Sequence, residues 1–257
     1  MQTLPPSPMP AKMVARVVLS NRLLAALLIA LVAGLAGAAS AQTQAQTEAQ
    51  TQAQTQAQTQ AKTRPVRIVV LGDSLVAGFQ IRTADAFPAQ LERALKARGH
   101  AVVVMNAGVS GDTTAGGLER LAWAVPGGTD AVIVELGAND ALRGLDPGRA
   151  RANLDAIVSK LKSGGAEVLL AGMLAPRNFG DDYARRFDAI YGELAGKHGV
   201  LLYPFFLDGV ALDAKLNLGD GLHPNPAGVA EITRRILPLV EQLIARVRAR
   251  EGAGKRG

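Results

Sequence analysis

The strongest constraint on the fold is a regular alternation of short apolar runs with helix-like stretches from residue 64 onward. Five continuous apolar runs have the character of strands covered on both faces: residues 66–71, 101–105, 131–136, 167–173 and 200–205. Four stretches carry apolar residues at helical spacing: residues 87–98, 149–162, 184–198 and 225–250. This alternation predicts a parallel sheet with helices on both faces, an α/β fold. Because such sheets bind ligands beyond the carboxyl ends of their strands, site residues are expected just after strand ends.

The N-terminal segment before this pattern reads as a secretory signal peptide over residues 1–41. It contains three basic residues and no acid: Lys12, Arg16 and Arg22. An apolar run over residues 23–36 follows, and small residues at 39–41 form a cleavage site. An uncleaved membrane anchor is the alternative. However, glycines interrupt the run, which is shorter than the about 20 apolar residues that a span needs.

Residues 42–63 repeat Gln, Thr and Ala and have nothing large to bury, so they are predicted to be a flexible linker. Residues 251–257 are expected to form a disordered tail. The absence of cysteine excludes disulfides and a thiol nucleophile, and three histidines in all argue against a metal site. No cofactor and no metal are therefore expected. Of the net charge of +6, three charges lie in residues 1–41, and the remaining +3 does not indicate nucleic-acid binding.

Polar or glycine-containing motifs follow the first three predicted strands. Ser74, in Gly-Asp-Ser-Leu, would present a hydroxyl at the start of the next element, or merely cap a helix. Gly111 could present a bare backbone N–H to a ligand, or belong to a turn leading into a helix near Leu118. Asn139 could donate a hydrogen bond to a developing oxyanion, or form an Asx turn.

A possible acid–histidine pair, Asp220 and His223, follows the fifth predicted strand and precedes the last helix. The spacing allows the carboxylate to orient the imidazole, as in a hydrolytic triad, although a polar loop before a capped helix is the alternative. The other histidines, His100 and His198, sit at helix ends and are interpreted as structural. A nucleophile, oxyanion donors and an Asp–His pair at one edge of the sheet together indicate a serine hydrolase.

On these motifs the chain resembles the SGNH or GDSL hydrolase family, whose four signature blocks occur in order across about residues 66–245. The resemblance implies a flavodoxin-like three-layer α/β/α sandwich with a five-stranded parallel sheet, in a domain over residues 64–250. It also implies a nucleophile, its base, the third triad member and two oxyanion donors: Ser74, His223, Asp220, Gly111 and Asn139. In the implied mechanism the Ser74 backbone N–H also belongs to the oxyanion hole.

The closest resemblance is to the branch of bacterial periplasmic thioesterases, lysophospholipases and related arylesterases. It is carried by residues 110–113, 134–140 and 204–206. Ala138 replaces a glycine of that branch, and Arg177 replaces a small side chain. The resemblance implies a periplasmic or secreted enzyme that acts on small acyl esters, thioesters or lysophospholipids. A monomer with at most peripheral membrane contact is expected.

Substrate-binding residues are predicted near the motif ends: Asp73, Leu75, Phe179 and Leu222. Other apolar residues there could line an acyl groove or pack in the core: Val76, Phe79, Leu142 and Leu145. Three other functions stay open, namely a carbohydrate O-acetylesterase on the same fold, a non-catalytic binding module, and a membrane-surface protein recruited by its basic C-terminal helix. The absence of a Gly-x-Ser-x-Gly elbow argues against the α/β-hydrolase fold.

Overall fold

The computed structural model describes residues 46, 50 and 64–254, and residues 64–254 belong to one structural unit. The predicted signal peptide, residues 1–41, lies outside the described residues. So does the predicted linker, residues 42–63, apart from Gln46 and Gln50. The continuous described part of the chain begins at residue 64.

Five parallel strands form one sheet in the order β2-β1-β3-β4-β5. Their bounds are β1 Val66–Gly72, β2 Val102–Gly108, β3 Ala131–Glu135, β4 Glu167–Ala171 and β5 Leu201–Tyr203. All five predicted strands are confirmed, and the order is that of the flavodoxin-like fold. The order reverses at β1, which has β2 on one side and β3 on the other. Ligands bind beyond the strands at such a switch point.

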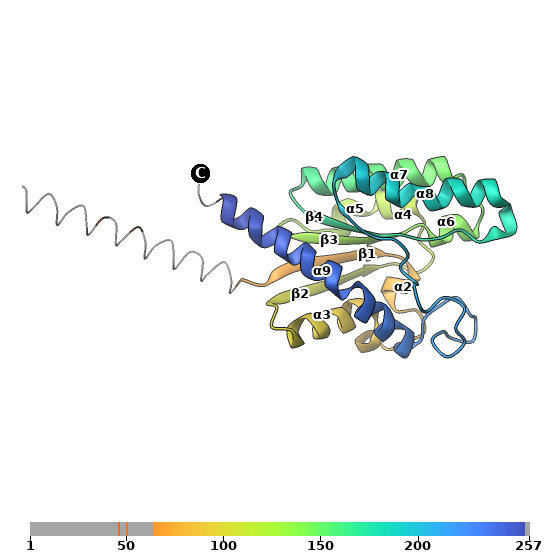
Figure 1. The fold of residues 1–257 in the computed structure, drawn as a ribbon, viewed down its shortest axis with the longest axis horizontal. Coiled ribbons are helices and arrows are strands. Elements are labelled where there is room, and N and C mark those ends of the chain that lie inside the picture. The colour runs from red at the N-terminus through yellow and green to blue at the C-terminus, as the bar shows by residue number, and fades with distance from the viewer. Residues whose placement is uncertain (1–45, 47–49, 51–63, 255–257) are drawn as a thin grey trace, which may run out of the picture. The chain divides into compact units, whose positions relative to one another are not determined.

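Helices cover both faces of the sheet, with α3 and α9 on one face and α4, α5, α7 and α8 on the other (Figure 1). The bounds are α2 Ser74–Ala77, α3 Phe87–Ala97, α4 Thr114–Glu119, α5 Leu121–Ala124, α6 Ala138–Leu142, α7 Pro147–Ser163, α8 Asp181–His198 and α9 Pro226–Gly254. Two 3₁₀ turns, η1 Thr83–Asp85 and η2 Arg177–Phe179, lie in loops. The four long helices and the one near Leu118 are confirmed, whereas the short α2, α5 and α6 were not predicted.

The core lies between the sheet and its helices, and the central strands are buried on both faces. Every residue of β3 is buried, and α3 presents Phe87, Leu91 and Leu95 to the sheet at a spacing of four residues. The edge strand β2 departs from the prediction, because Val103 and Met105 are 43% and 37% exposed. As an edge strand it packs against α3 and pairs with β1 on one side.

Helix α9 begins at Pro226, after Asn225 accepts the backbone N–H groups of Ala227 and Gly228. It continues to Gly254, so the disordered tail expected from residue 251 is wrong for its first residues. Glu251, in this extra turn, binds both Arg64 and Arg248. The pair with Arg64 ties the end of the helix to the residues just before β1, whereas the pair with Arg248 lies within the helix. None of the helices in the described part of the chain has the length and apolar character of a membrane span.

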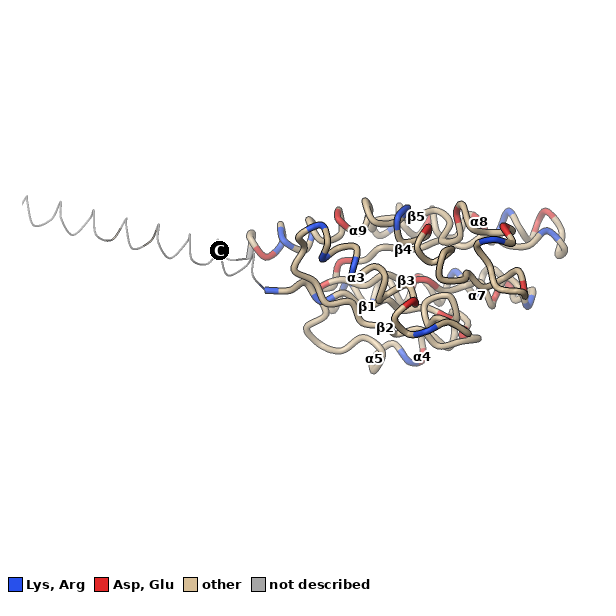
Figure 2. The backbone as a smooth tube through the Cα atoms, turned by 90° about the horizontal axis from the view of Figure 1, so that it is seen from below, with Lys and Arg blue, Asp and Glu red and all other residues tan. Residues whose placement is uncertain are grey.

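Positive and negative side chains are interspersed along the described backbone (Figure 2). The basic residues of α9 illustrate this pattern, because Arg235 binds Glu231 and Asp208, and Arg250 binds Glu167. The described helix therefore does not present an uncompensated row of cations, and this arrangement does not favour recruitment to an anionic membrane through α9. The last two basic residues of the chain lie outside the described residues.

Candidate active site

Ser74 stands at the turn from β1 into α2. A side chain at Gly72 would collide with Val76 and Glu135, so a glycine is needed where the strand ends. Asp73 then caps α2, with its Oδ1 accepting the Leu75 N–H at 3.0 Å. The serine hydroxyl is thereby held at the carboxyl edge of the sheet, on a side chain that is mostly buried.

His223 reaches Ser74 from the other half of the sheet. The Nε2 atom of His223 lies 2.9 Å from Ser74 Oγ, and its Nδ1 lies 2.7 Å from Asp220 Oδ2. The His223 ring also packs on Phe79, with 4.5 Å between ring centroids. The structure therefore brings the three predicted triad residues into one hydrogen-bonded chain.

The loop that carries Asp220 and His223 joins β5 to α9, as predicted, but it is long. The fifth strand ends at Tyr203, so the pair does not directly follow a strand but comes late in the long β5–α9 loop. An isolated bridge between Asn217 and Pro224 folds this loop back on itself, and Leu218 donates its N–H to the His223 carbonyl at 2.7 Å. These contacts fix the position of the imidazole without a neighbouring strand.

Asp220 is held as a carboxylate. Its Oδ1 accepts the backbone N–H groups of His223 at 3.0 Å and Leu222 at 2.9 Å, and its Oδ2 faces the imidazole. These hydrogen bonds, led by the one from the His223 backbone, lower the pKa of Asp220 to about 2. An ionised Asp220 has no proton to donate, so Nδ1 of His223 must be the donor. Nε2 of a neutral ring is then free to accept the Ser74 proton.

Asn139 lies at the start of α6, after Gly137. Its Nδ2 donates to the Asp112 carbonyl at 2.9 Å and to Asp73 Oδ2 at 3.1 Å, so it joins the segments that follow β1, β2 and β3. Gly111, next to Asp112, is exposed and has a φ of 83°. The structure therefore places Asn139 beside the Ser74 turn, whereas Gly111 is linked to it only through its neighbour Asp112, and the Gly111 carbonyl accepts a hydrogen bond from Arg143.

A cavity of about 460 Å³ opens beside Ser74. It is lined by Asp73, Ser74, Leu75, Ala138, Asn139, Ala141, Leu142, Met173, Leu174, Ala175, Pro176, Phe205, Leu207, Leu212, Leu222 and His223. Most of these side chains are apolar, and a few polar groups gather at the serine, as in small-molecule sites. The cavity therefore suits an apolar group attached to a reactive polar one.

The predicted substrate-binding residues divide into two sets. Asp73, Leu75 and Leu222 line the cavity, whereas Phe179 does not, because its ring packs on Tyr183 with 5.4 Å between centroids. Among the other apolar candidates only Leu142 lines it. Five other lining residues after β4 and β5 were not predicted to bind substrate: Met173, Leu174, Phe205, Leu207 and Leu212. Their position after strand ends was the available signal.

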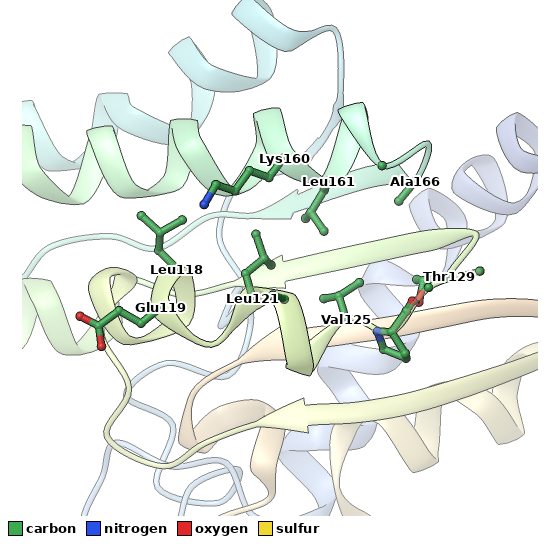
Figure 3. A pocket seen from close by; sticks show the side chains of 13 residues that line it. Leu118, Glu119, Leu121, Val125, Thr129, Lys160, Leu161 and Ala166 are labelled. Carbon is green, nitrogen blue, oxygen red and sulfur yellow. The ribbon is translucent and has the colours of Figure 1, made fainter.

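A second cavity, of about 340 Å³, lies between the α4–α5 region and the end of α7 (Figure 3). Leu118, Leu121, Val125 and Leu161 give it apolar walls, and Lys160 also lines it. It contains none of the predicted site residues, so we assign the chemistry to the cavity that holds the Ser74–His223 contact. Within the described residues, no three His, Asp or Glu side chains lie so that they could hold a metal ion.

Comparisons with known proteins agree with this arrangement. A family model described as the GDSL-like Lipase/Acylhydrolase family matches residues 70–230. An arylesterase of Vibrio mimicus is 42% identical over 161 residues, which are 62% of this chain and 80% of the relative. A thioesterase 1/protease 1/lysophospholipase L1 of Escherichia coli is 39% identical over 159 residues, 62% of this chain and 75% of the relative.

The fold is also shared with solved structures. The crystal structure of TesA superposes with a TM-score of 0.66 at 36% identity, and it covers 69% of this chain and 99% of its own. Since the family model spans the Ser74 turn and the His223 loop, the similarity includes the whole candidate site. The chain therefore belongs to the GDSL-like lipase/acylhydrolase family, and is a carboxylic ester hydrolase by that membership.

Proposed function

We propose that the protein hydrolyses acyl esters with Ser74 as nucleophile, His223 as general base and Asp220 as the group that orients the base. The observation that carries this proposal is the unbroken chain from Ser74 Oγ through the His223 ring to Asp220, with contacts of 2.9 Å and 2.7 Å. Hydrogen-bond contact between nucleophile and base, with a third group orienting the base, is the arrangement that activates a serine.

The reaction has two halves. Ser74 Oγ attacks the acyl carbonyl while its proton moves to His223 Nε2, and the C–O or C–S bond to the leaving group then breaks as His223 donates that proton to the leaving alcohol or thiol. Water then attacks the acyl-enzyme while His223 Nε2 accepts its proton, and the bond to Ser74 Oγ breaks as His223 donates that proton to Oγ, which releases the acid. The oxyanion of each tetrahedral intermediate accepts hydrogen bonds from the backbone N–H groups of Ser74 and Gly111 and from Asn139 Nδ2.

The apolar cavity favours an acyl chain over a sugar as the group bound beside Ser74. Leucine, methionine and phenylalanine side chains dominate its lining, whereas an O-acetylesterase for carbohydrates would need polar groups there. The relatives are an arylesterase and a thioesterase/lysophospholipase, so aryl esters, thioesters and lysophospholipids are the substrate classes we propose. A non-catalytic binding module is not favoured, because each triad and oxyanion position is filled by a competent group.

We also propose that the enzyme is exported to the periplasm or secreted, on the basis of the signal-like sequence at residues 1–41. Export fits substrates that occur outside the cytoplasm, such as lysophospholipids. N-terminal sequencing of the protein recovered from the extracytoplasmic fraction tests this directly. A mature chain that begins near residue 42 is expected, and a full-length chain in the cytoplasm would refute export.

The hydrolytic function is tested with p-nitrophenyl esters from acetyl to palmitoyl, using residues 42–257 beside Ser74→Ala. The wild-type protein should prefer medium or long chains, and Ser74→Ala should lose about 10⁴–10⁶-fold in kcat. A phosphonate ester should label wild-type Ser74 stoichiometrically, and mass spectrometry locates the adduct. Wild-type rates in Ser74→Ala would refute the proposal, and a preference confined to acetyl would favour the carbohydrate esterase.

A further inference from the structure

Two carboxyl groups that the proposed reaction does not use lie buried behind Ser74. Asp73 and Glu135 are both fully inaccessible to solvent. Glu135 stands at the end of β3, and its Oε2 accepts the backbone N–H of Asp73 at 3.2 Å. Its Oε1 has no hydrogen-bond partner, and no ion pair joins Glu135 to a cation among the described residues. Burial of an acid with an unpartnered oxygen is unfavourable, so a functional role is expected for Glu135.

Electrostatics decides which of the two carboxyl groups holds a proton. Burial, and then the charge of Asp73, raise the pKa of Glu135 well above its usual range. Burial also raises the pKa of Asp73, to about 6, although the Leu75 N–H, the charge of His223 and side-chain hydrogen bonds with Asn139 and Glu135 oppose the effect. Two buried carboxylates side by side would repel each other, and one of them would keep an unpartnered oxygen.

The groups around the pair favour the same distribution of charge. Asp140 on α6 accepts hydrogen bonds from Thr114, and the Tyr191 hydroxyl on α8 donates to the Leu136 carbonyl rather than to Glu135. The nearby buried cation, Arg120, binds Asp112 and the Gly72 carbonyl. His223 lies on the Asp73 side of the pair. The carboxylate is therefore best placed on Asp73, which lines the cavity, and the proton on Glu135, whose side chain hydrogen-bonds that of Asp73.

The Asp73 carboxylate contacts the predicted oxyanion donor. Of the two hydrogens on Asn139 Nδ2, one goes to Asp73 Oδ2 and the other to the Asp112 carbonyl. A carboxamide can be turned end for end, and its oxygen would repel an oxyanion. Because an ionised Asp73 can only accept, it requires the NH₂ end of Asn139 to face it. The hydrogen bond to the neutral Asp112 carbonyl is the weaker of the two.

We propose that Asp73 and Glu135 form a buried carboxyl pair that holds one proton, on Glu135, and that positions the Asn139 side chain as an oxyanion donor. Throughout the reaction, Asp73 accepts a hydrogen bond from one hydrogen of Asn139 Nδ2. The other hydrogen leaves the Asp112 carbonyl and is donated to the oxyanion when the oxyanion forms. Asp73 and Glu135 are thus positioning residues. The inference rests on the proposed function, because it presumes that an oxyanion forms beside Asn139.

The proton on Glu135 can be detected by infrared spectroscopy, independently of enzyme activity. A protonated carboxyl gives an infrared C=O stretch that shifts on deuteration, and an exposed acid has lost this band by about pH 8. The wild-type protein should keep such a band at about pH 8, and Glu135→Gln should abolish it. Absence of the band from the wild-type protein, or its persistence in Glu135→Gln, would overturn the assignment of the proton.

The positioning role is tested by a double-mutant cycle between Asp73 and Asn139. Asp73→Asn leaves one oxygen for two donors, so it should lower kcat by about 10–100-fold and change KM little. In the Asn139→Ala background the same change should cost less than about threefold, because the group that it positions is gone. Asp140→Asn is the matched control, since this buried acid binds Thr114 rather than the Asn139 side chain.

The possible outcomes separate the two proposals. Asp140→Asn should cost the same factor in kcat with and without Asn139, whereas the effect of Asp73→Asn should depend on Asn139. Equal effects of Asp73→Asn in both backgrounds would overturn the positioning role even if hydrolysis depends on Ser74. Activity that is independent of Ser74 would instead refute the proposed function itself.

Discussion

At the residue scale, Asp73 serves two neighbouring elements with one carboxylate. Its Oδ1 caps α2 and its Oδ2 holds Asn139, which follows β3. The cap is a local contact of a kind that aspartate commonly makes at a helix start, although α2 itself was not predicted. The contact with Asn139 joins residues 66 positions apart. It therefore depends on the strand order and not on local sequence.

The buried state of Asp73 predicts a pH dependence of stability. Because folding raises the pKa of Asp73 to about 6, the folded chain binds this proton more tightly than the unfolded chain. The contribution of Asp73 to stability is therefore greatest at low pH and falls as the pH rises from about 4 through about 6. Asp73→Asn should remove this fall and lessen that from Glu135, whose pKa the charge of Asp73 raises, while burial alone still raises the pKa of Glu135 in both proteins.

The measurement is urea unfolding of both proteins at about pH 5 and about pH 7. The wild-type protein should lose more of its free energy of unfolding between the two pH values than Asp73→Asn loses. Equal losses would mean that Asp73 titrates alike in the folded and unfolded chains.

Asp220 gives a second prediction at this scale, about the tautomer of the imidazole. Asp220→Asn keeps an oxygen for the Leu222 and His223 N–H groups, so the loop should stay folded. The new amide can donate a hydrogen bond to Nδ1, which favours the tautomer with its proton on Nε2. Turnover should then fall by about 10³–10⁴-fold with little change in KM. Steady-state kinetics at fixed pH measures this, and a loss confined to KM would contradict it.

At the element scale, the turn between β3 and α6 sets the position of Asn139. Gly137 has a φ of 120°, and a Cβ there would collide with the Tyr191 hydroxyl, which donates to the Leu136 carbonyl at 2.8 Å. We predict that Gly137→Ala lowers the free energy of unfolding by about 1–3 kcal/mol and also lowers kcat, because Asn139 shifts. Denaturant unfolding and steady-state kinetics measure the two effects.

Gly165 offers the matched control for this change. It has a φ of 83° in the turn between α7 and β4, but nothing lies within 4 Å of an added Cβ. Gly165→Ala should therefore cost backbone strain alone, about 1 kcal/mol, and leave kcat at the wild-type value. If both variants lost kcat equally, the turn at Gly137 would have no special part in placing Asn139.

The same scale shows what the sequence could predict. The four long helices could be predicted because burial of one face gives their apolar residues a helical period, and the five strands because burial of both faces makes them continuous apolar runs. Helices α2, α5 and α6 have too few turns to show a period. The conformation of the β5–α9 loop could not be predicted either, because its bridge between Asn217 and Pro224 forms only in the folded chain. The buried acid Glu135 was visible in its apolar run, but its meaning required the neighbouring strand.

The positions of residues in loops also explain why only some of the residues that line the cavity were predicted. Leu75 and Leu222 stand beside Ser74 and His223 in the sequence, so their place in the lining follows from the motifs. Phe179 lies on η2, and its ring turns to Tyr183 instead. Met173 and Leu207 enter the cavity from loops after β4 and β5, where no side-chain period guides prediction.

At the scale of the whole molecule, the candidate site is assembled from both halves of the sheet. Ser74 and Asn139 follow the adjacent strands β1 and β3, whereas His223 comes from the loop after the edge strand β5. Alignment of Ser74 with His223 thus requires the complete sheet and the docked α9. Activity and global unfolding should therefore be lost together rather than in separate steps.

The last prediction concerns the boundary of this unit. Every described contact of the candidate site is made by residues from 72 onward, and Arg64 makes the first ion pairs of the domain, with Asp130 and Glu251. A chain of residues 60–257 should therefore match residues 42–257 in kcat/KM, and in free energy of unfolding to within about 0.5 kcal/mol. Arg64→Ala in the shorter chain should cost about 1 kcal/mol or less, since the pairs of this half-exposed side chain are screened by solvent. Ester hydrolysis and urea unfolding, measured on the same preparations, test these predictions of kcat/KM and of the free energy of unfolding. If removing residues 42–59 lowered either quantity well beyond these margins, the repeat of Gln, Thr and Ala would be part of the working enzyme rather than a linker.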